Sequence, residues 1–213
     1  TSERISDIEN RLTEYPYKQR LDDPSFHLVK GKIRLFLQDK KSIIKQLEIN
    51  IKNKSYVSEL GERYALTYAY LLNGNFKEAQ REMNWLKNQN IKNPMIDQLE
   101  IEILIKKGEI NTVFTSLKKA LKKYPNYRAF VYELANYFIE KKSADKAIKH
   151  LQNYLLIFKT DPELYKLLAK AYSLNGNKLL QYESLAESFY YRYNLQEAIV
   201  QMDMAAQSRD GNF

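Results

Sequence analysis

Cysteine is absent from the 213 residues, and histidine, glycine and proline are scarce, with 2, 6 and 5 copies. Without cysteine there are no disulfides and no cysteine zinc sites. So few turn-forming residues cannot supply the many tight turns of a β-sandwich or β-barrel. Two histidines leave little room for histidine catalysis or a histidine metal site. We therefore expect no catalytic residue, no bound metal and no cofactor in this chain.

Long hydrophobic runs are also missing, because stretches such as Tyr154–Phe158 fall far short of the roughly 20 apolar residues of a membrane span. We therefore expect no transmembrane segment. Hydrophobic residues make up 44% of the chain and charged residues 28%, as in an ordinary folded protein. The net charge of +8 favours anionic partners only weakly. No signal peptide opens the chain and its first residue is Thr1, so we expect a fragment or a processed form.

A period of 34 residues runs through the middle of the chain. Gly74 and Gly108 lie 34 residues apart, Gly176 lies 68 residues further on, and Lys142 stands at the remaining place. The residues four places earlier are large and mostly aromatic, namely Tyr70, Leu104, Phe138 and Tyr172. Where a small residue is expected five places later, the chain has Ala79, Val113, Ala147 and, one unit on, Ala198. This period, with glycine between two helices, is typical of the tetratricopeptide repeat (TPR).

We predict an all-α fold, a right-handed TPR superhelix of antiparallel helix pairs, in a single TPR-like domain over residues 1–213. Its expected parts are an N-terminal helix and loop (1–23), an irregular first pair (24–55), regular 34-residue repeats (56–177) and an overlapping terminal pair (178–213). In the first pair, Phe26, Val29, Ile33 and Phe36 are expected to face Ile43, Ile44, Leu47 and Ile51. The expected helices are 2–14, 24–38, 41–53, 56–73, 76–90, 94–107, 110–123, 127–141, 144–158, 162–175, 178–192 and 195–208.

Helix starts are marked by residues that can cap an N-terminus. Asp161 precedes a proline and a glutamate, which is the order of a cap, an N1 proline and a first-turn acid. Asn75 and Asn194 are each followed three residues later by glutamate, as in a capping box. Ser143 and Asn126 are expected to cap their own helices.

Repeats of this kind leave a groove lined by the first helix of each pair. We expect the fifth and ninth positions of each unit to be exposed there and to bind a partner. They are Tyr64, Tyr68, Gln98, Glu102, Tyr132, Asn136, Lys166 and Lys170. Tyrosine is favoured at interfaces, where it offers rigid apolar area and a hydroxyl group. The alternative for each residue is packing between helices or a solvated face. No two adjacent units carry the lysine and asparagine set that clamps acidic chaperone tails.

Lysine doublets such as 118–119 and 122–123 could suggest nucleic acid. No nucleic-acid motif accompanies them, and a solvated helix face is the better interpretation. The many tyrosines at helical spacing are interpreted as packing residues in the same way. We expect His27 and His150 to be structural, since neither lies in a catalytic or metal-binding motif.

Several stretches carry a more specific pattern. Near the start these are Arg4–Leu12 and Asp23–Arg34; near the end they are Leu168–Asn177, Leu185–Tyr191, Leu195–Ile199 and Gln207–Phe213. Together they resemble the C-terminal half of bacterial periplasmic zinc metallopeptidases with TPR tails, the BepA-like β-barrel assembly-enhancing proteases. The resemblance covers nearly the whole chain and is strongest at 1–36 and 165–213.

In that family an HExxH peptidase domain precedes the TPR tail, which docks on the protease and on the outer-membrane assembly machinery. This chain has no HExxH, so no catalytic or zinc-binding residue carries over, and zinc belongs only to a peptidase domain outside it. The resemblance implies a periplasmic location and a protein partner: the peptidase domain, outer-membrane assembly components or extended peptide segments. The alternative is a stand-alone adaptor of a multiprotein complex, cytoplasmic and without a protease.

Overall fold

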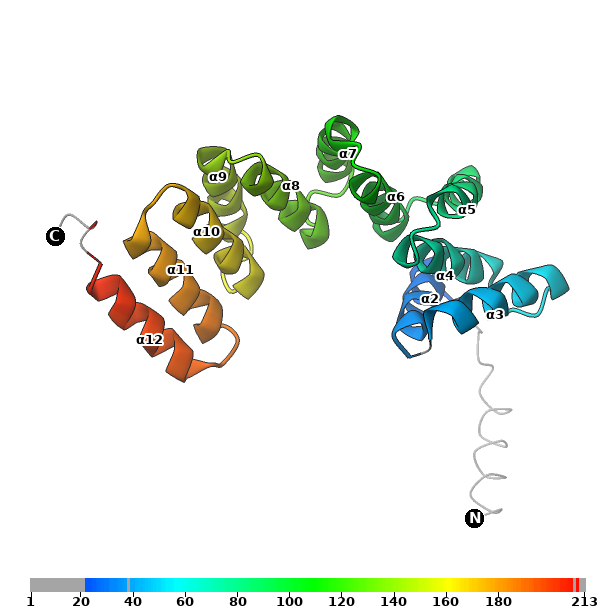
Figure 1. The fold of residues 1–213 in the computed structure, drawn as a ribbon, viewed down its shortest axis with the longest axis horizontal. Coiled ribbons are helices and arrows are strands. Elements are labelled where there is room, and N and C mark those ends of the chain that lie inside the picture. Colours follow the sequence, from blue (N-terminus) through cyan, green and yellow to red (C-terminus); the bar gives the residue numbers. More distant parts are fainter. Residues whose placement is uncertain (1–21, 38, 209, 211–213) are drawn as a thin grey trace, which may run out of the picture. The chain divides into compact units, whose positions relative to one another are not determined.

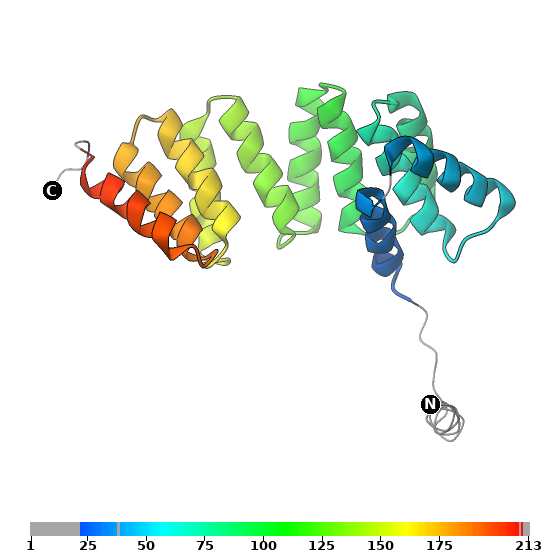
Figure 2. The same ribbon diagram turned by 60° about the horizontal axis from the view of Figure 1, so that its bottom comes forward.

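The computed structural model describes residues 22–37, 39–208 and 210. These residues form α-helices and no strands, so the all-α prediction is confirmed for them (Figures 1 and 2). The helix expected at 2–14 lies outside the described residues. The chain divides into two compact units, Thr1–Asn90 and Ile91–Phe213. The expectation of one domain over 1–213 stays a prediction.

The helix bounds agree with the expected ones to within three residues at every end. Helices of the first unit are α2 (Pro24–Leu37), α3 (Lys40–Asn53), α4 (Glu59–Leu72) and α5 (Phe76–Asn88). Helices of the second are α6 (Pro94–Lys106), α7 (Ile110–Lys123), α8 (Arg128–Glu140), α9 (Ala144–Leu155), α10 (Pro162–Leu174), α11 (Lys178–Tyr190) and α12 (Leu195–Ala206). The largest difference at a start is at α4, which begins at Glu59 because Ser58 caps it with its side-chain oxygen.

The turn between the two helices is the same in the four pairs from α4–α5 to α10–α11. Gly74, Gly108 and Gly176 have φ angles of 79°, 74° and 72°, in the left-handed region that glycine enters without strain. Lys142 adopts φ 52° at the fourth place, and its neighbours make the same hydrogen bonds. In each turn the residue after this position donates its N–H to the carbonyl five residues earlier, as in a Schellman motif. The 34-residue period is therefore a repeat of backbone geometry.

The expected caps are confirmed in part. The Asp161 side chain accepts hydrogen bonds from the N–H groups of Glu163 and Leu164, and Pro162 is the first residue of α10. Asn194 accepts from the Glu197 N–H. Asn75 and Ser143 stand at the cap positions but make no side-chain capping bond. The Asn126 prediction is wrong, because α8 starts at Arg128 with Tyr127 at the cap position.

The first unit is organised around α4, on which α2 and α3 both pack. Leu28 and Leu35 are the buried side chains of α2, whereas Phe26, Val29, Ile33 and Phe36 are exposed. The prediction that this second set faces α3 is therefore wrong. The physical reason is that Gly31 lies on the Leu28 side of α2 and allows a close approach to α4 only there.

The approach of α2 to α4 is at backbone distance. A Cβ atom added to Gly31 would lie 2.7 Å from the Gly61 carbonyl oxygen, and one added to Gly61 would lie 2.9 Å from the His27 carbonyl oxygen. Real Cβ atoms do not come so near to backbone oxygen. Two glycines, one on each helix, thus set the crossing of α2 and α4.

A buried carboxylate joins α2, α3 and α4. Glu62 on α4 accepts hydrogen bonds from Arg34 on α2 and from the Asn50 amide on α3. Only 11% of the Glu62 side chain and 29% of the Arg34 side chain are exposed. The equivalent positions of the later repeats are buried and apolar, namely Ile96, Phe130 and Leu164. The irregular first pair is thus held by a polar contact where the regular repeats use apolar packing.

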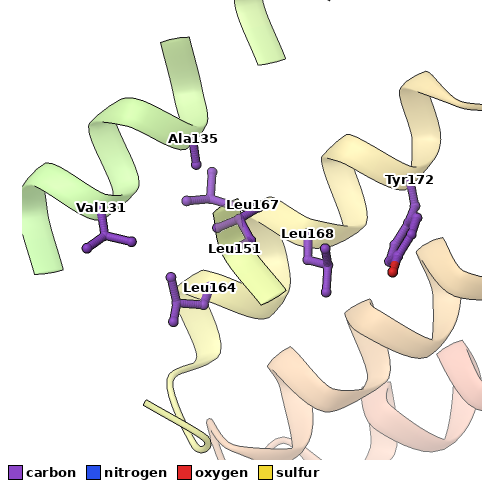
Figure 3. Close-up of a cluster of buried hydrophobic side chains, with 7 residues drawn as sticks. All are labelled: Val131, Ala135, Leu151, Leu164, Leu167, Leu168 and Tyr172. Carbon is purple, nitrogen blue, oxygen red and sulfur yellow. The ribbon is translucent and has the colours of Figure 1, made fainter. Parts of the chain in front are cut away.

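The second unit is held by apolar clusters that pass from one helix pair to the next. Figure 3 shows the cluster of α8, α9 and α10, built from Val131, Ala135, Leu151, Leu164, Leu167, Leu168 and Tyr172. A second cluster joins α6, α7 and α8 around Phe130 and Leu117. Ala147 and Val113, which stand where a small residue is expected five places after the turn position, are both buried. Each pair thus buries the face that its neighbour leaves open, as in other repeat proteins.

The last three helices lie side by side, with α11 packed on both α10 and α12 (Figures 1 and 2). A left-handed turn residue recurs at Tyr193 (φ 61°), only 17 residues after Gly176. Helix α11 therefore ends one pair and begins the next, as the shift in sequence phase predicts.

Candidate interaction surface

The two predicted groove residues of the first unit lie on α4, close to its neighbours. Tyr64 is only 1% exposed, so the prediction that its side chain is exposed is wrong. Its ring packs 6.4 Å from the ring of Tyr68, centroid to centroid. Tyr68 is half-buried, and the Lys32 ammonium group lies 4.6 Å from its ring centroid, a cation–π contact between α2 and α4. These tyrosines contribute to packing within the unit.

On α6, Gln98 and Glu102 are half-buried and bonded to each other. The Gln98 amide donates to the Glu102 carboxylate at 2.9 Å, and the Tyr127 hydroxyl donates to the Gln98 oxygen at 2.9 Å. Burial, and after it the charge of Glu102, raises the pKa of the Tyr127 hydroxyl. These contacts orient the Glu102 carboxylate and connect α6 to the start of α8.

Tyr132 on α8 is tied to the start of α10. Its hydroxyl donates to Asp161, the residue that caps α10, and the Arg128 guanidinium also contacts Asp161 at 3.1 Å. Burial alone would raise the pKa of Asp161, but these two partners and the helix N–H groups hold it below its ordinary value. Burial, and next the bond to Asp161, raises the pKa of Tyr132. Tyr132 therefore stabilises the contact between two repeats, whatever else it binds.

The predicted lysines on α10 have different surroundings. Lys166 lies 3.5 Å from the Glu163 carboxylate, which also accepts from Arg192 at 2.9 Å. Lys170 is exposed. Both cations are available to a partner, with Lys166 held in place by its neighbour.

A cavity of about 110 Å³ opens between α6, α7 and α8. Asn136, one of the predicted residues, lines it together with Glu133, Glu140 and Tyr137. Ile105, Ile110 and Val113 form much of the remaining wall. The cavity combines apolar sides with carboxylates, which suits a side chain that has an apolar stem and a cationic end.

Glu133 is a functional candidate that our sequence interpretation missed. The neighbouring repeats have Leu99 and Leu167 at this position, and both are buried. Burial raises the pKa of Glu133, and the charges of Glu102 and Glu140 raise it further. A carboxylate at a leucine position is a departure from the repeat that the 34-residue alignment could have revealed. Perturbed carboxyl groups of this kind are concentrated at functional sites.

Replacing Glu133 by the leucine of the adjacent repeats is expected to stabilise the protein by about 1 kcal/mol at neutral pH. The reason is that a buried apolar side chain replaces a carboxylate whose charged form is destabilised by burial and by two neighbouring carboxylates. The pKa of Glu133 is raised on folding, so its protonated form favours the folded state. The native protein then loses stability as the pH rises above the unfolded value of about 4.3. The advantage of Glu133→Leu over the native chain should therefore grow between pH 4 and pH 7 in urea titrations. An advantage that stays constant with pH would contradict this.

His150 contacts a neighbouring helix, and the lysines of α7 lie at its surface. His150 is partly buried on α9, and its Nε2 lies 3.0 Å from the Val131 carbonyl oxygen. Burial lowers the pKa of this imidazole, so it is neutral at physiological pH. Lys118, Lys119 and Lys122 are exposed on α7. Among the described residues, no group of histidine and acidic side chains could hold a metal ion, and no helix has the length and hydropathy of a membrane span.

A tetratricopeptide-repeat family model matches residues 104–171, from the end of α6 into α10. The chain has the tetratricopeptide-repeat fold. The matched segment contains the turns at Gly108 and Lys142 and the buried residues Val113 and Ala147 that follow them. Comparison with curated proteins gives no match.

Solved TPR structures are similar to most of the chain. A thermophilic TPR protein of Thermus thermophilus is 17% identical with a TM-score of 0.62, over 87% of this chain and 100% of that one. A TPR protein from Parabacteroides merdae is 13% identical with a TM-score of 0.57, over 84% of this chain and 77% of that one. YrrB, described as a TPR protein with an unusual peptide-binding site, is 11% identical with a TM-score of 0.54, over 92% and 97%. At these identities the similarity shows the fold alone.

Proposed function

We propose that this chain is a non-catalytic scaffold that binds a protein segment, and that the α6–α8 cavity takes a basic side chain of that segment. The observation that carries the proposal is Glu133, a carboxylate that lines the cavity at a position where the adjacent repeats bury leucine. A residue that destabilises its own repeat and lines a cavity is better explained by a role in binding than by a role in folding.

The chemistry of the cavity favours lysine or arginine. The effects on the Glu133 pKa are burial and two neighbouring carboxylates, with no cation among them. A bound ammonium or guanidinium group would supply the missing positive charge and lower that pKa. Ile105 and Ile110 would contact the methylene stem of the same side chain. Asn136 also lines the cavity, and its amide could hydrogen-bond the backbone of a bound segment.

Three predicted residues extend this surface along α8 and α10. Tyr132 on α8 and Lys166 on α10 occupy the same repeat position as Gln98 on α6, and Lys170 follows on α10. An extended segment that places a basic residue in the cavity could pass along these helices. An acidic residue further along the same segment would then contact Lys166 and Lys170. The peptide-binding site reported for YrrB supports this use of the fold, at the level of analogy.

Selection of random peptides on the immobilised protein tests the proposal. We expect the selected peptides to share a lysine or arginine beside apolar residues. Glu133→Gln, which keeps the side-chain volume and removes the charge, should weaken their binding about tenfold, since charge-assisted contacts contribute on this scale. Glu183→Gln removes the same charge from exposed α11 and should have no effect. If Glu133→Gln binds the peptides as the native chain does, the cavity is not the site. If substitutions at Lys118 and Lys119 weaken binding instead, the α7 face replaces it.

We further propose, more narrowly, that the chain is the TPR module of a periplasmic zinc metallopeptidase involved in outer-membrane β-barrel protein assembly and quality control. The support is the sequence resemblance at 1–36 and 165–213. In this case the partner is the peptidase domain or an outer-membrane assembly component, and zinc belongs to that domain. The alternative is a stand-alone adaptor of a multiprotein complex, in the cytoplasm.

The native open reading frame separates these two candidates. An upstream signal sequence followed by an HExxH domain in the same frame would support the metallopeptidase module. A start codon close to Thr1 would contradict it and leave the adaptor. This observation is independent of the peptide test, which addresses the cavity in either case.

A further inference from the structure

Two apolar surfaces lie on the first and last helices that the structure describes. Helix α2 exposes Phe26, Val29, Ile33 and Phe36, the last of them at 73%. Helix α12 exposes several large apolar side chains, among them Ile199 at 63%. Singly exposed apolar residues are common, but contiguous patches mark interaction surfaces.

The C-terminal patch is hollowed. A groove of about 470 Å³ lies between α11 and α12, lined by Tyr190 of α11 and by Leu195, Ile199 and Met202 of α12. The α12 residues follow one another at intervals of four and three, so they line one side of the helix. Apolar grooves between two helices of this kind receive the apolar face of an amphipathic helix.

The α2 patch has the form of such a face. Phe26, Val29, Ile33 and Phe36 follow at intervals of three, four and three, the spacing of helix-in-groove anchors. The other side of α2 is held on α4 by Leu28 and Leu35, so the anchors are already arranged before any partner binds. Helices of 14 and 12 residues are about 21 and 18 Å long, so α2 matches the length of α12.

The charges of the two surfaces are opposite. Helix α2 has no acidic residue; of its cations Lys30 is exposed, whereas Lys32 lies over the Tyr68 ring and Arg34 is paired with Glu62. From Lys178 to Ala206 the chain has two basic and four acidic residues, a net charge of 2 − 4 = −2 in a protein of net charge +8. Glu197 and Asp203 lie on α12 itself, which has no basic residue. Contact between two α12 faces or between two α2 faces would bring like charges together, whereas α2 against α12 brings opposite ones.

We propose that α2 of one copy docks in the α11–α12 groove of a second copy, so that the chain self-associates head to tail. The contact is heterologous: each copy offers one face of each kind and keeps the other free for the next copy. Since a single helix in a groove buries less surface than a standard interface, the association is weak and depends on concentration and salt.

Sedimentation velocity on the full chain tests the proposal. The average mass should rise with concentration at low salt and fall when salt is added. Phe36→Asp on α2 and Ile199→Asp on α12 place a charge in each apolar surface without touching a buried residue. Each should weaken self-association about tenfold or more, as for a central apolar anchor. A native chain that stays monomeric at high concentration overturns the proposal, because its own residues 1–21 or another protein then covers these faces.

Mixing the two variants distinguishes the head-to-tail contact from other modes of self-association. The Phe36→Asp copy keeps its groove and the Ile199→Asp copy keeps its α2 face, so the mixture should form a one-to-one dimer that does not grow further. This also shows that both variants are folded. If Phe36→Asp associates like the native chain, or if the mixture stays monomeric, the head-to-tail contact is wrong.

Discussion

Gly31→Ala is expected to lower the free energy of unfolding of the first unit by about 1–3 kcal/mol, the range for overpacking a tight contact. Alanine is the better helix former, so helix propensity alone would favour the substitution by about 1 kcal/mol. Crowding outweighs it, because the new Cβ atom would lie 2.7 Å from the Gly61 carbonyl oxygen and 3.2 Å from the Ala65 Cβ. A backbone oxygen cannot turn aside as a side chain can, so α2 must move away from α4.

Hydrogen exchange locates the effect. Amides of α2 and α4 should lose protection in Gly31→Ala, while those of α8 and α10 keep theirs, since repeats are stabilised mainly by their neighbours. Gly74 supplies the control: it has a left-handed backbone and nothing within 4 Å of its added Cβ. Asparagine tolerates that backbone, so Gly74→Asn should cost little, whereas Gly31→Asn should be severe. If Gly74→Asn and Gly31→Asn lowered the free energy of unfolding equally, the helix crossing would not be the reason that glycine is needed at Gly31.

The fold could be predicted because the repeat marks the chain at positions that local geometry requires. Gly74, Gly108 and Gly176 are needed for left-handed turns, and the turns at Gly74, Gly108 and Lys142 are followed five places later by the buried residues Ala79, Val113 and Ala147. Helix starts were less certain. Asn126 has the right side chain for a cap, but the turn that follows α7 places Tyr127 there instead. Caps depend on the path of the preceding loop, which residue type alone does not determine.

The candidate site was harder to predict, because equivalent positions of a repeat differ in burial. Tyr64 occupies the same position as Gln98 and Lys166, yet it is buried, in a helix on which α2 and α3 both pack. The same crowding explains why α2 turns Leu28 and Leu35 to α4 and leaves Phe36 exposed. Glu133 was missed because it does not occupy the fifth or ninth position of its repeat. Only a comparison with Leu99 and Leu167, which occupy its position in the adjacent repeats, identifies it as unusual.

Arg34→Met is expected to lower the free energy of unfolding by about 2–3 kcal/mol, because it leaves the Glu62 carboxylate buried without its cation. The figure is below that of a fully buried pair, since 29% of the Arg34 side chain is exposed and solvent screens part of the interaction. Asn50 would remain as a hydrogen-bond donor to Glu62. Its amide is neutral, however, and its Nδ2 lies 3.4 Å from the Glu62 Oε2. Urea titrations of the native chain and the variant measure the loss.

Glu62→Leu gives the matched comparison, because leucine is what Leu164 provides at the same place in a regular repeat. Glu62→Leu should lower the free energy of unfolding by no more than about 1 kcal/mol, since the freed Arg34 guanidinium can reach water at a partly exposed site. The double variant Arg34→Met/Glu62→Leu should then recover most of the stability that Arg34→Met loses, as apolar replacement of ion pairs does elsewhere. If the double variant is as unstable as Arg34→Met, the methylene stem of Arg34 and not its charge holds α2 on α4. The polar contact of the first pair would then be a by-product of packing.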